Sequence, residues 1–161
     1  MPNLHPLVVH FPIALLIVGF LFDVFGLLLR KDWAKRAGLV LIVLGSVGAL
    51  TAMLSGSAAE EAVEAALSET GEEMLEAHES IGQWAAYAWL AIAALRLLIA
   101  TPWLKKVQNA AWGMYLLGAV AGLAMITLTA YRGGELVYTY GGGVQLSAPG
   151  GVILNEDPDD D

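Results

Sequence analysis

Cysteine is missing from this chain, and basic residues are scarce in it. Without cysteine there are no disulfides, no thiolate zinc sites, no iron–sulfur clusters and no covalent c-type haem attachment. Eight Lys and Arg residues stand against sixteen Asp and Glu residues, so the formal net charge is −8, which argues against nucleic acid as a partner. The sequence also lacks motifs for an activated nucleophile, a phosphate loop or a two-histidine zinc site, so it predicts no catalytic residues.

Apolar residues are what the chain has in abundance. They make up 57% of its 161 residues, against about 45–50% in an ordinary soluble domain, and the mean hydropathy is +0.63. Four apolar runs, at 7–29, 37–56, 81–100 and 110–130, approach the ~20 residues that a helix needs to cross a bilayer. The sequence therefore predicts an all-α membrane protein, a bundle of four transmembrane helices embedded in lipid.

The predicted transmembrane domain covers residues 1–134, with helices at about 6–30, 36–67, 71–101 and 108–131. The third helix begins at a capping-box pattern, in which Thr70 is the N-cap and Glu73 returns to its backbone. At 1.5 Å per residue this helix would be ~45 Å long, which exceeds the ~30 Å of hydrocarbon. The second and third helices are therefore predicted to extend outside the membrane as an acidic hairpin.

The distribution of charged residues predicts how the protein is oriented across the membrane. Seven of the eight Lys and Arg residues lie at 30–36 or 96–106, in or beside two of the three connections between helices. Fourteen of the sixteen Asp and Glu residues lie at 60–79 or beyond residue 134. Since basic connections favour the cytoplasmic side, both termini are predicted to lie outside.

The residues after the fourth helix change character. Residues 135–140 have the composition of a β-strand, 141–143 are three glycines that predict a turn, and 144–146 are able to pair back. A short β-like tail with a hairpin is therefore predicted within 135–154. The acidic residues 155–161 are predicted to be disordered.

All three histidines fall at the outer end of the predicted bundle. His78 belongs to an apolar stripe of the third helix that includes Trp89 and Arg96, so its ring is predicted to point inward. His5 and His10 differ by ~140° in direction on a continuous helix, so one of them is expected to face inward. We select His10, the deeper residue, and keep His5 as the alternative. Two inward imidazoles from different helices are the axial ligands that a b-type haem needs, whereas interfacial, hydrogen-bonded histidines are the alternative interpretation.

Small residues on the other two helices offer room for a flat macrocycle. Gly118 and Gly122 form such a stripe on the fourth helix and are candidate cofactor-binding residues, although close helix packing alone explains stripes of this kind. Arg132 is the single basic residue at the outer end, and we expect it to pair with haem propionates. Anchoring the helix end at the interface is the alternative role for Arg132.

Two charges lie inside the predicted membrane spans. Asp23 and Arg96 have matching depths, and a buried ion pair avoids the cost of at least ~2.5 kcal/mol for either charge alone at the bilayer centre. A proton path through Asp23, or an Arg96 side chain that snorkels to the interface, are the alternatives. Gly19, Asp23 and Gly26 lie on nearly the opposite face from His10, which would require Pro12 to kink the helix.

The segment LHPLVVHFPIALL at residues 4–16 is distinctive. It resembles the opening of the bacterial membrane family catalogued as domain of unknown function 2231. Two later features also resemble that family: the segment GGELVY at 133–138, followed by a Gly-Val that ends at Val144, and a histidine ahead of the third helix, here His78. The resemblance implies four helices and a bacterial inner (cytoplasmic) membrane. Some members are joined to c-type cytochrome domains, which implies a respiratory context, although this chain has no such domain.

Two functions follow as hypotheses. In the first, the protein is a membrane subunit that binds haem b through His10 and His78 and passes electrons near the non-cytoplasmic face to a periplasmic or membrane redox protein. In the second, it is a haem-free scaffold or accessory subunit whose acidic outer surface docks a periplasmic partner. Electrostatic steering of a basic partner is compatible with either. The sequence leaves open whether the chain forms homo- or hetero-oligomers.

Overall fold

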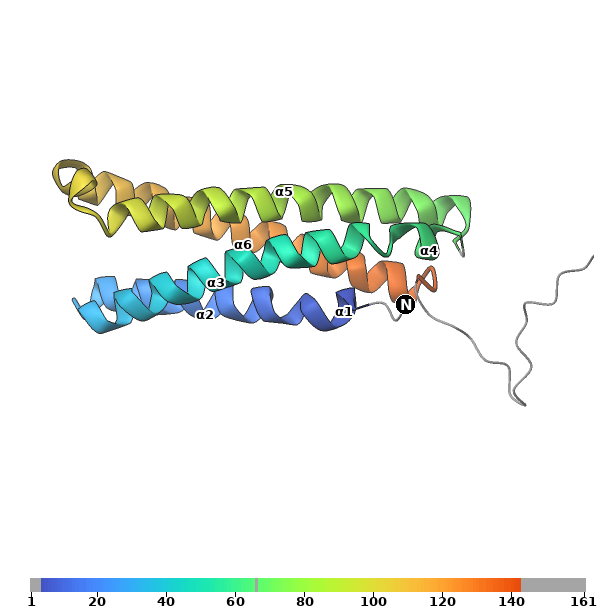
Figure 1. Ribbon diagram of the computed structural model, residues 1–161, viewed down its shortest axis with the longest axis horizontal. Coiled ribbons are helices and arrows are strands. Elements are labelled where there is room, and N and C mark those ends of the chain that lie inside the picture. Colours follow the sequence, from blue (N-terminus) through green and yellow to red (C-terminus); the bar gives the residue numbers. More distant parts are fainter. Residues whose placement is uncertain (1–3, 66, 143–161) are drawn as a thin grey trace, which may run out of the picture.

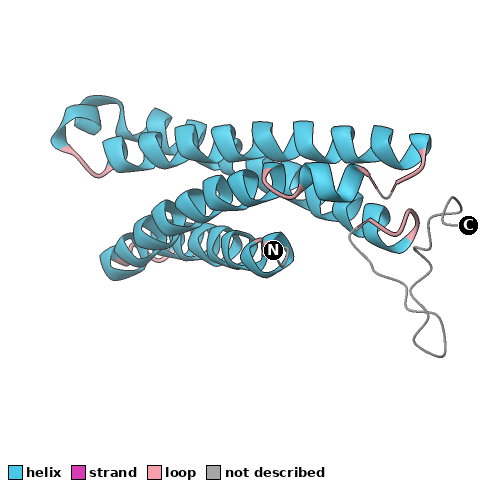
Figure 2. Ribbon diagram, turned by 45° about the vertical axis from the view of Figure 1, so that its right-hand side comes forward, coloured by secondary structure: helices cyan, strands magenta, loops and turns pink. Residues whose placement is uncertain are grey.

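The computed structural model describes residues 4–65 and 67–142, leaving aside the side chains of Glu61 and Ala62. The elements in chain order are α1 (His5–Val8), α2 (His10–Leu28), α3 (Asp32–Ser57), α4 (Glu60–Glu64), α5 (Glu69–Ile99), the 3₁₀ helix η1 (Pro102–Val107) and α6 (Gln108–Tyr138). Within the described ranges the regular secondary structure is entirely helical, and short loops join the helices (Figure 2). Four segments are long and apolar enough to cross a membrane: His5–Leu28, Asp32–Ser57, Glu69–Ile99 and Pro102–Tyr138. The prediction of a four-helix transmembrane bundle is confirmed.

The helices form two antiparallel hairpins that meet along one seam. α2 packs along α3 and α6 packs along α5, and the two hairpins are joined mainly by α3 against α5 and also by α2 against α6. α3 runs obliquely, from beside α2 at its N-terminal end to beside α5 at its C-terminal end (Figure 1). We call the end that carries α4 and the first turns of α5 the acidic end, and the end that carries the α2–α3 connection and η1 the basic end.

The core is narrow, and small residues let the helices approach closely. Trp89, Tyr115 and Leu16 are fully buried at its centre. A Cβ atom on Gly122 would lie 2.9 Å from the Trp89 ring, and one on Gly45 would lie 2.7 Å from Leu16 Cγ. Large apolar side chains elsewhere are exposed, since the bilayer rather than protein covers them.

The first predicted helix, 6–30, is two helices in the structure. The break at Val9 separates α1 from α2 and lies within one turn of Pro12, which has no N–H to donate to the carbonyl of Val8. α2 ends where Arg30 adopts a left-handed conformation with φ of 53°, and Lys31 N–H donates to the Gly26 carbonyl. The α2–α3 connection is therefore short and tightly turned.

The second predicted helix, 36–67, is not continuous. α3 ends at Ser57, and the single turn of α4 follows as a separate piece. Two local features favour the break: Gly56 is a weak helix former, and the Ser57 hydroxyl donates to Glu79 on α5 at 2.8 Å. The third helix does extend beyond a bilayer's thickness, since α5 has 31 residues. It begins at Glu69 after Ser68, so the prediction that Thr70 is the N-cap is wrong.

The predicted β-strand at 135–140 is also wrong, because α6 continues to Tyr138. Leu136 is buried on this last stretch, so tertiary packing overrides the strand-like composition. The helix stops where Gly141 adopts φ of 73° and Gly142 N–H donates to the Leu136 carbonyl at 2.9 Å. The partner strand at 144–146 and the predicted disorder of 155–161 lie outside the described residues.

Candidate functional site: a histidine pair and a buried ion pair

Two histidines from different hairpins meet at the acidic end. The ring centres of His5 on α1 and His78 on α5 are 6.3 Å apart, and their planes are nearly perpendicular at 86°. Both side chains are half-buried. The prediction that His78 points into the bundle agrees with this placement, and its partner there is His5.

A backbone carbonyl orients each ring. His5 Nδ1 lies 2.9 Å from the Ala52 carbonyl oxygen of α3, and His78 Nδ1 lies 3.0 Å from the Thr129 carbonyl oxygen of α6. A carbonyl only accepts hydrogen bonds, so Nδ1 is the protonated nitrogen of each neutral ring and Nε2 carries the lone pair. The Ser55 hydroxyl also lies 3.1 Å from His5 Nδ1.

A glycine lies close to each ring. A Cβ atom on Gly56 would be 3.1 Å from His5 Cε1, and one on Gly133 would be 2.9 Å from His78 Cε1. A larger residue at either position would force the ring or the helix to shift. Four helical segments that meet at the acidic end, α1, α3, α5 and α6, therefore contribute to the position of the two imidazoles.

His10 does not join this pair, which corrects our choice between the two histidines of the first helix. The buried face of α2 is formed by Pro12, Leu16, Gly19, Asp23 and Gly26. His10 is two residues before Pro12, roughly 160° away around a helix, and it is exposed. His5 is seven residues before Pro12 and therefore shares its face. The stripe of Gly19 and Gly26, continued backward in steps of seven, would have identified His5.

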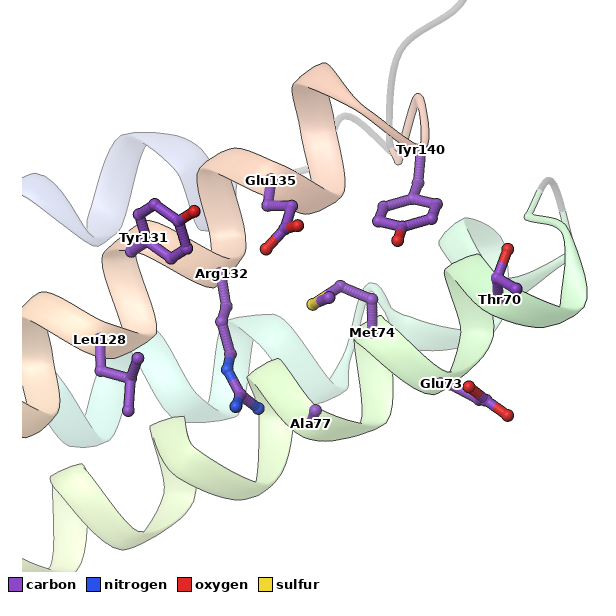
Figure 3. A pocket seen from close by; sticks show the side chains of 9 residues that line it. All are labelled: Thr70, Glu73, Met74, Ala77, Leu128, Tyr131, Arg132, Glu135 and Tyr140. Atoms are coloured by element: carbon purple, nitrogen blue, oxygen red, sulfur yellow. The ribbon is translucent and has the colours of Figure 1, made fainter.

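The other predicted cofactor residues lie elsewhere. Gly118 and Gly122 pack against Ile92 and Trp89 in the middle of the bundle, which is the close-packing role. Arg132 lines a pocket between α5 and α6 at the acidic end, together with Met74 and Glu135 (Figure 3). The glycines that contact the histidines are Gly56 and Gly133. Gly56 falls on the same helix face as Gly45, Ala49 and Ala52, a stripe of small residues that the sequence shows, whereas nothing in a single sequence pairs Gly133 with His78.

A buried ion pair ties the four membrane helices together toward the basic end. Arg96 of α5 donates to both carboxylate oxygens of Asp23 on α2, at 2.9 Å from Nε and 2.8 Å from a terminal nitrogen. The Tyr115 hydroxyl of α6 donates to Asp23 at 2.7 Å. Arg96 also donates to the Lys35 carbonyl of α3 at 2.6 Å. The predicted Asp23–Arg96 pair is confirmed, and the alternative in which Arg96 snorkels is wrong.

The environment of this pair explains how a charge is tolerated there. Asp23 is 0% exposed and Arg96 is 2% exposed. The Arg96 guanidinium lies 4.5 Å from the centre of the Trp112 ring, an attractive cation–π contact. A Cβ atom on Gly38 would lie 2.5 Å from the Asp23 carboxylate, so glycine makes room for it. Tyr115 as a partner was not predicted, because its depth follows from counting residues but nothing in the sequence shows that its side chain points toward Asp23.

Glutamates of α4 and α5 cluster at the acidic end. Glu60 of α4 shares a hydrogen bond with Glu79 of α5. This hydrogen bond, partial burial and the nearby charges of Glu79, Glu64 and Glu76 raise the pKa of Glu60 above its ordinary value of 4.5. Negative charge is therefore crowded around α4 and the first turns of α5, which we call the acidic cap.

The fold defines the class of this chain: it is a multi-pass membrane protein built on four apolar helices. A family model described as "Predicted membrane protein (DUF2231)" matches residues 1–146. The chain belongs to this family, as the resemblance of its N-terminal segment indicated. Neither the curated proteins nor the solved structures contain a match.

Proposed function

We propose that His5 and His78 hold a b-type haem between them, and that the protein passes electrons near the non-cytoplasmic face of the membrane. The observation that carries this proposal is the histidine pair itself. Two imidazoles from separate hairpins lie next to one another with ring centres 6.3 Å apart.

The spacing supports a shared metal ion. A metal binds an imidazole nitrogen at about 2.0–2.1 Å, so two imidazoles on opposite sides of one ion have ring centres roughly 6 Å apart. The perpendicular ring planes do not oppose this arrangement, because each imidazole can turn about its own metal–nitrogen bond. The carbonyls of Ala52 and Thr129 add the expected outer support, since histidine ligands usually donate their other N–H to such a group.

The number of ligands favours haem over a bare ion. Structural and catalytic zinc sites use three or four protein side chains, whereas haem already supplies four equatorial nitrogens and needs two axial ligands. In the part of the chain that the structure describes, no group of three or more His, Cys, Asp or Glu side chains is placed to hold a metal. Since the chain has no cysteine, a haem here would be held without thioether bonds, as in b-type cytochromes.

A haem in this position would lie close to the acidic end. It would supply one-electron chemistry, and this chain would supply the axial nitrogens and the apolar helices around it. The acidic cap favours a redox partner with a basic surface, since opposite charges speed association. We therefore assign the protein the role of an electron-transfer subunit rather than of an enzyme acting alone.

The absorption spectrum of protein purified after expression with ample haem tests the proposal. We expect sharp α and β bands on reduction, as a six-coordinate low-spin haem gives. His5→Ala and His78→Ala should each abolish these bands or leave a high-spin species. His10→Ala is the matched control and should keep the wild-type spectrum, because its side chain is exposed on the far side of the helix.

Two results would contradict the proposal. If the wild-type protein is colourless and takes up no haem, the histidines serve as hydrogen-bonded links between α1, α3, α5 and α6. The second function, a haem-free scaffold whose acidic end docks a periplasmic partner, would then take its place. If His10→Ala loses haem while His5→Ala keeps it, the ligand assignment made from the structure is wrong.

A further inference from the structure

A pocket of about 530 Å³ lies between α5 and α6 at the acidic end, on a different part of the helices from the histidine rings. Met74 and Ala77 of α5 form one wall, and Arg132 and Glu135 of α6 form the other. Figure 3 shows the Arg132 side chain reaching across toward α5 near Ala77, while the Glu135 carboxylate stays beside Met74 and Tyr140 closes the far end. Its volume lies within the range of ligand pockets, roughly 300–1,000 Å³.

Two opposite charges enter this pocket without pairing. Arg132 and Glu135 are three residues apart on one helix, a spacing at which opposite charges commonly meet. Both are half-buried, yet the ion pairs found among residues 4–65 and 67–142 are Asp32–Lys35 and Asp23–Arg96. The guanidinium and the carboxylate are therefore held apart in one pocket. A ligand that fits them has a negative and a positive group of its own, a few ångströms apart.

The Glu135 carboxylate beside Arg132 makes a purely anionic ligand a poor fit for this pocket. Glu73 also lines the pocket, and its carboxylate points away from Arg132 (Figure 3). Leu128 and Tyr131, which line the same pocket, are 44% and 69% exposed. Leu128 is one helical turn nearer the middle of the bundle than Arg132, so an apolar, exposed surface leads directly from the lipid-facing part of α6 to the two charges.

We propose that this pocket binds the headgroup of a zwitterionic phospholipid with a primary ammonium, of the phosphatidylethanolamine kind. The phosphate lies on Arg132, whose fork of N–H donors suits phosphate oxygens. The ammonium lies beside Glu135 and donates N–H hydrogen bonds to its carboxylate. A trimethylated ammonium has no N–H group and cannot make these hydrogen bonds. The acyl chains follow Leu128 into the bilayer. The lipid joins α5 to α6 beside Ala77, the neighbour of His78, and this proposal does not depend on haem.

Native mass spectrometry of the delipidated protein in detergent tests the inference. Phosphatidylethanolamine, phosphatidylglycerol and phosphatidylcholine with the same acyl chains are titrated separately. We expect the ethanolamine lipid to bind most tightly. Arg132→Gln should weaken its binding by roughly tenfold, the loss expected for a charge-assisted hydrogen bond. Glu135→Gln should remove the preference over the choline lipid and raise the binding of the glycerol lipid.

The control is Glu69→Gln, which removes a carboxylate in the first turn of α5 that does not line the pocket. It should leave the order of the three lipids unchanged, and circular dichroism should confirm full helicity for every variant. Equal binding of the three lipids to the wild type would overturn the proposal, as would an Arg132→Gln variant that binds the ethanolamine lipid normally. A change of haem content without a change of lipid binding would assign Arg132 to the haem propionates instead.

Discussion

Removal of the Asp23 carboxylate is the perturbation whose cost the structure defines best. Asp23 accepts three hydrogen bonds, two from Arg96 and one from Tyr115. Asp23→Ala leaves the Arg96 guanidinium buried without its counter-charge. Asp23→Asn keeps the volume and one acceptor oxygen but also removes the charge, so the pair of variants separates the loss of charge from the loss of packing.

The expected loss of unfolding free energy in Asp23→Ala depends on the contacts that Arg96 keeps. Breaking a buried ion pair by removing one partner costs about 3–5 kcal/mol of unfolding free energy. After Asp23 is removed, Arg96 still donates to the Lys35 carbonyl at 2.6 Å and still lies over the Trp112 ring at 4.5 Å. These remaining contacts place the expected cost of Asp23→Ala near the lower end, ~3 kcal/mol. Tyr115→Phe, which deletes one hydrogen bond, should cost ~1 kcal/mol or somewhat more.

The assay is equilibrium unfolding in mixed micelles of dodecyl maltoside and sodium dodecyl sulfate, followed by the helical circular dichroism signal. A double-mutant cycle with Asp23→Ala and Arg96→Leu measures the coupling between the two residues. We expect the double variant to lose less than Asp23→Ala alone, because no charge is then stranded. Val18→Ala, on the exposed side of α2, is the control for a substitution that faces lipid.

One outcome of the cycle would refute this reasoning. If the loss in the double variant equals the sum of the two single losses, Asp23 and Arg96 do not stabilise each other in the membrane. A loss in Asp23→Asn below ~0.5 kcal/mol, the scale of an ordinary surface substitution, would likewise show that the charge of Asp23 contributes little.

Two further predictions concern orientation and pH. With cysteine introduced into this cysteine-free chain at Asp32 or at Glu69, we expect membrane-impermeant reagents to label the two positions from opposite sides; labelling of both from one side would contradict the topology. Folding raises the pKa of Glu60 above its ordinary 4.5, so the folded state favours the protonated carboxyl. The resulting stabilisation is complete below pH 4.5 and is lost as the pH rises through the raised pKa, so the melting temperature of the wild type should fall relative to that of Glu60→Gln over that interval. Parallel melting profiles for the two proteins would show that the Glu60–Glu79 contact is not present.

Local patterns predicted the membrane helices and one of the two polar sites. A run of ~20 apolar residues must be helical in lipid, because every backbone polar group needs a partner within its own segment. The Asp23–Arg96 pair was predictable for a related reason: a charge inside hydrocarbon requires a partner, and only these two residues have the right depth. The strand at 135–140 failed because it rested on a local preference that tertiary packing overrides. The capping box at Thr70 failed because Ser68 takes the N-cap position two residues earlier.

The sequence by itself determined that this protein crosses a membrane four times, because hydrophobic length is written directly in the order of residues. It also determined that three histidines share one end of the bundle. Only the tertiary structure decided that His5 rather than His10 meets His78, and that Gly133 and the Thr129 carbonyl support that ring. The reason is physical: depth along a helix follows from counting residues, whereas the direction in which a side chain points relative to other helices depends on how the helices rotate and pack against one another.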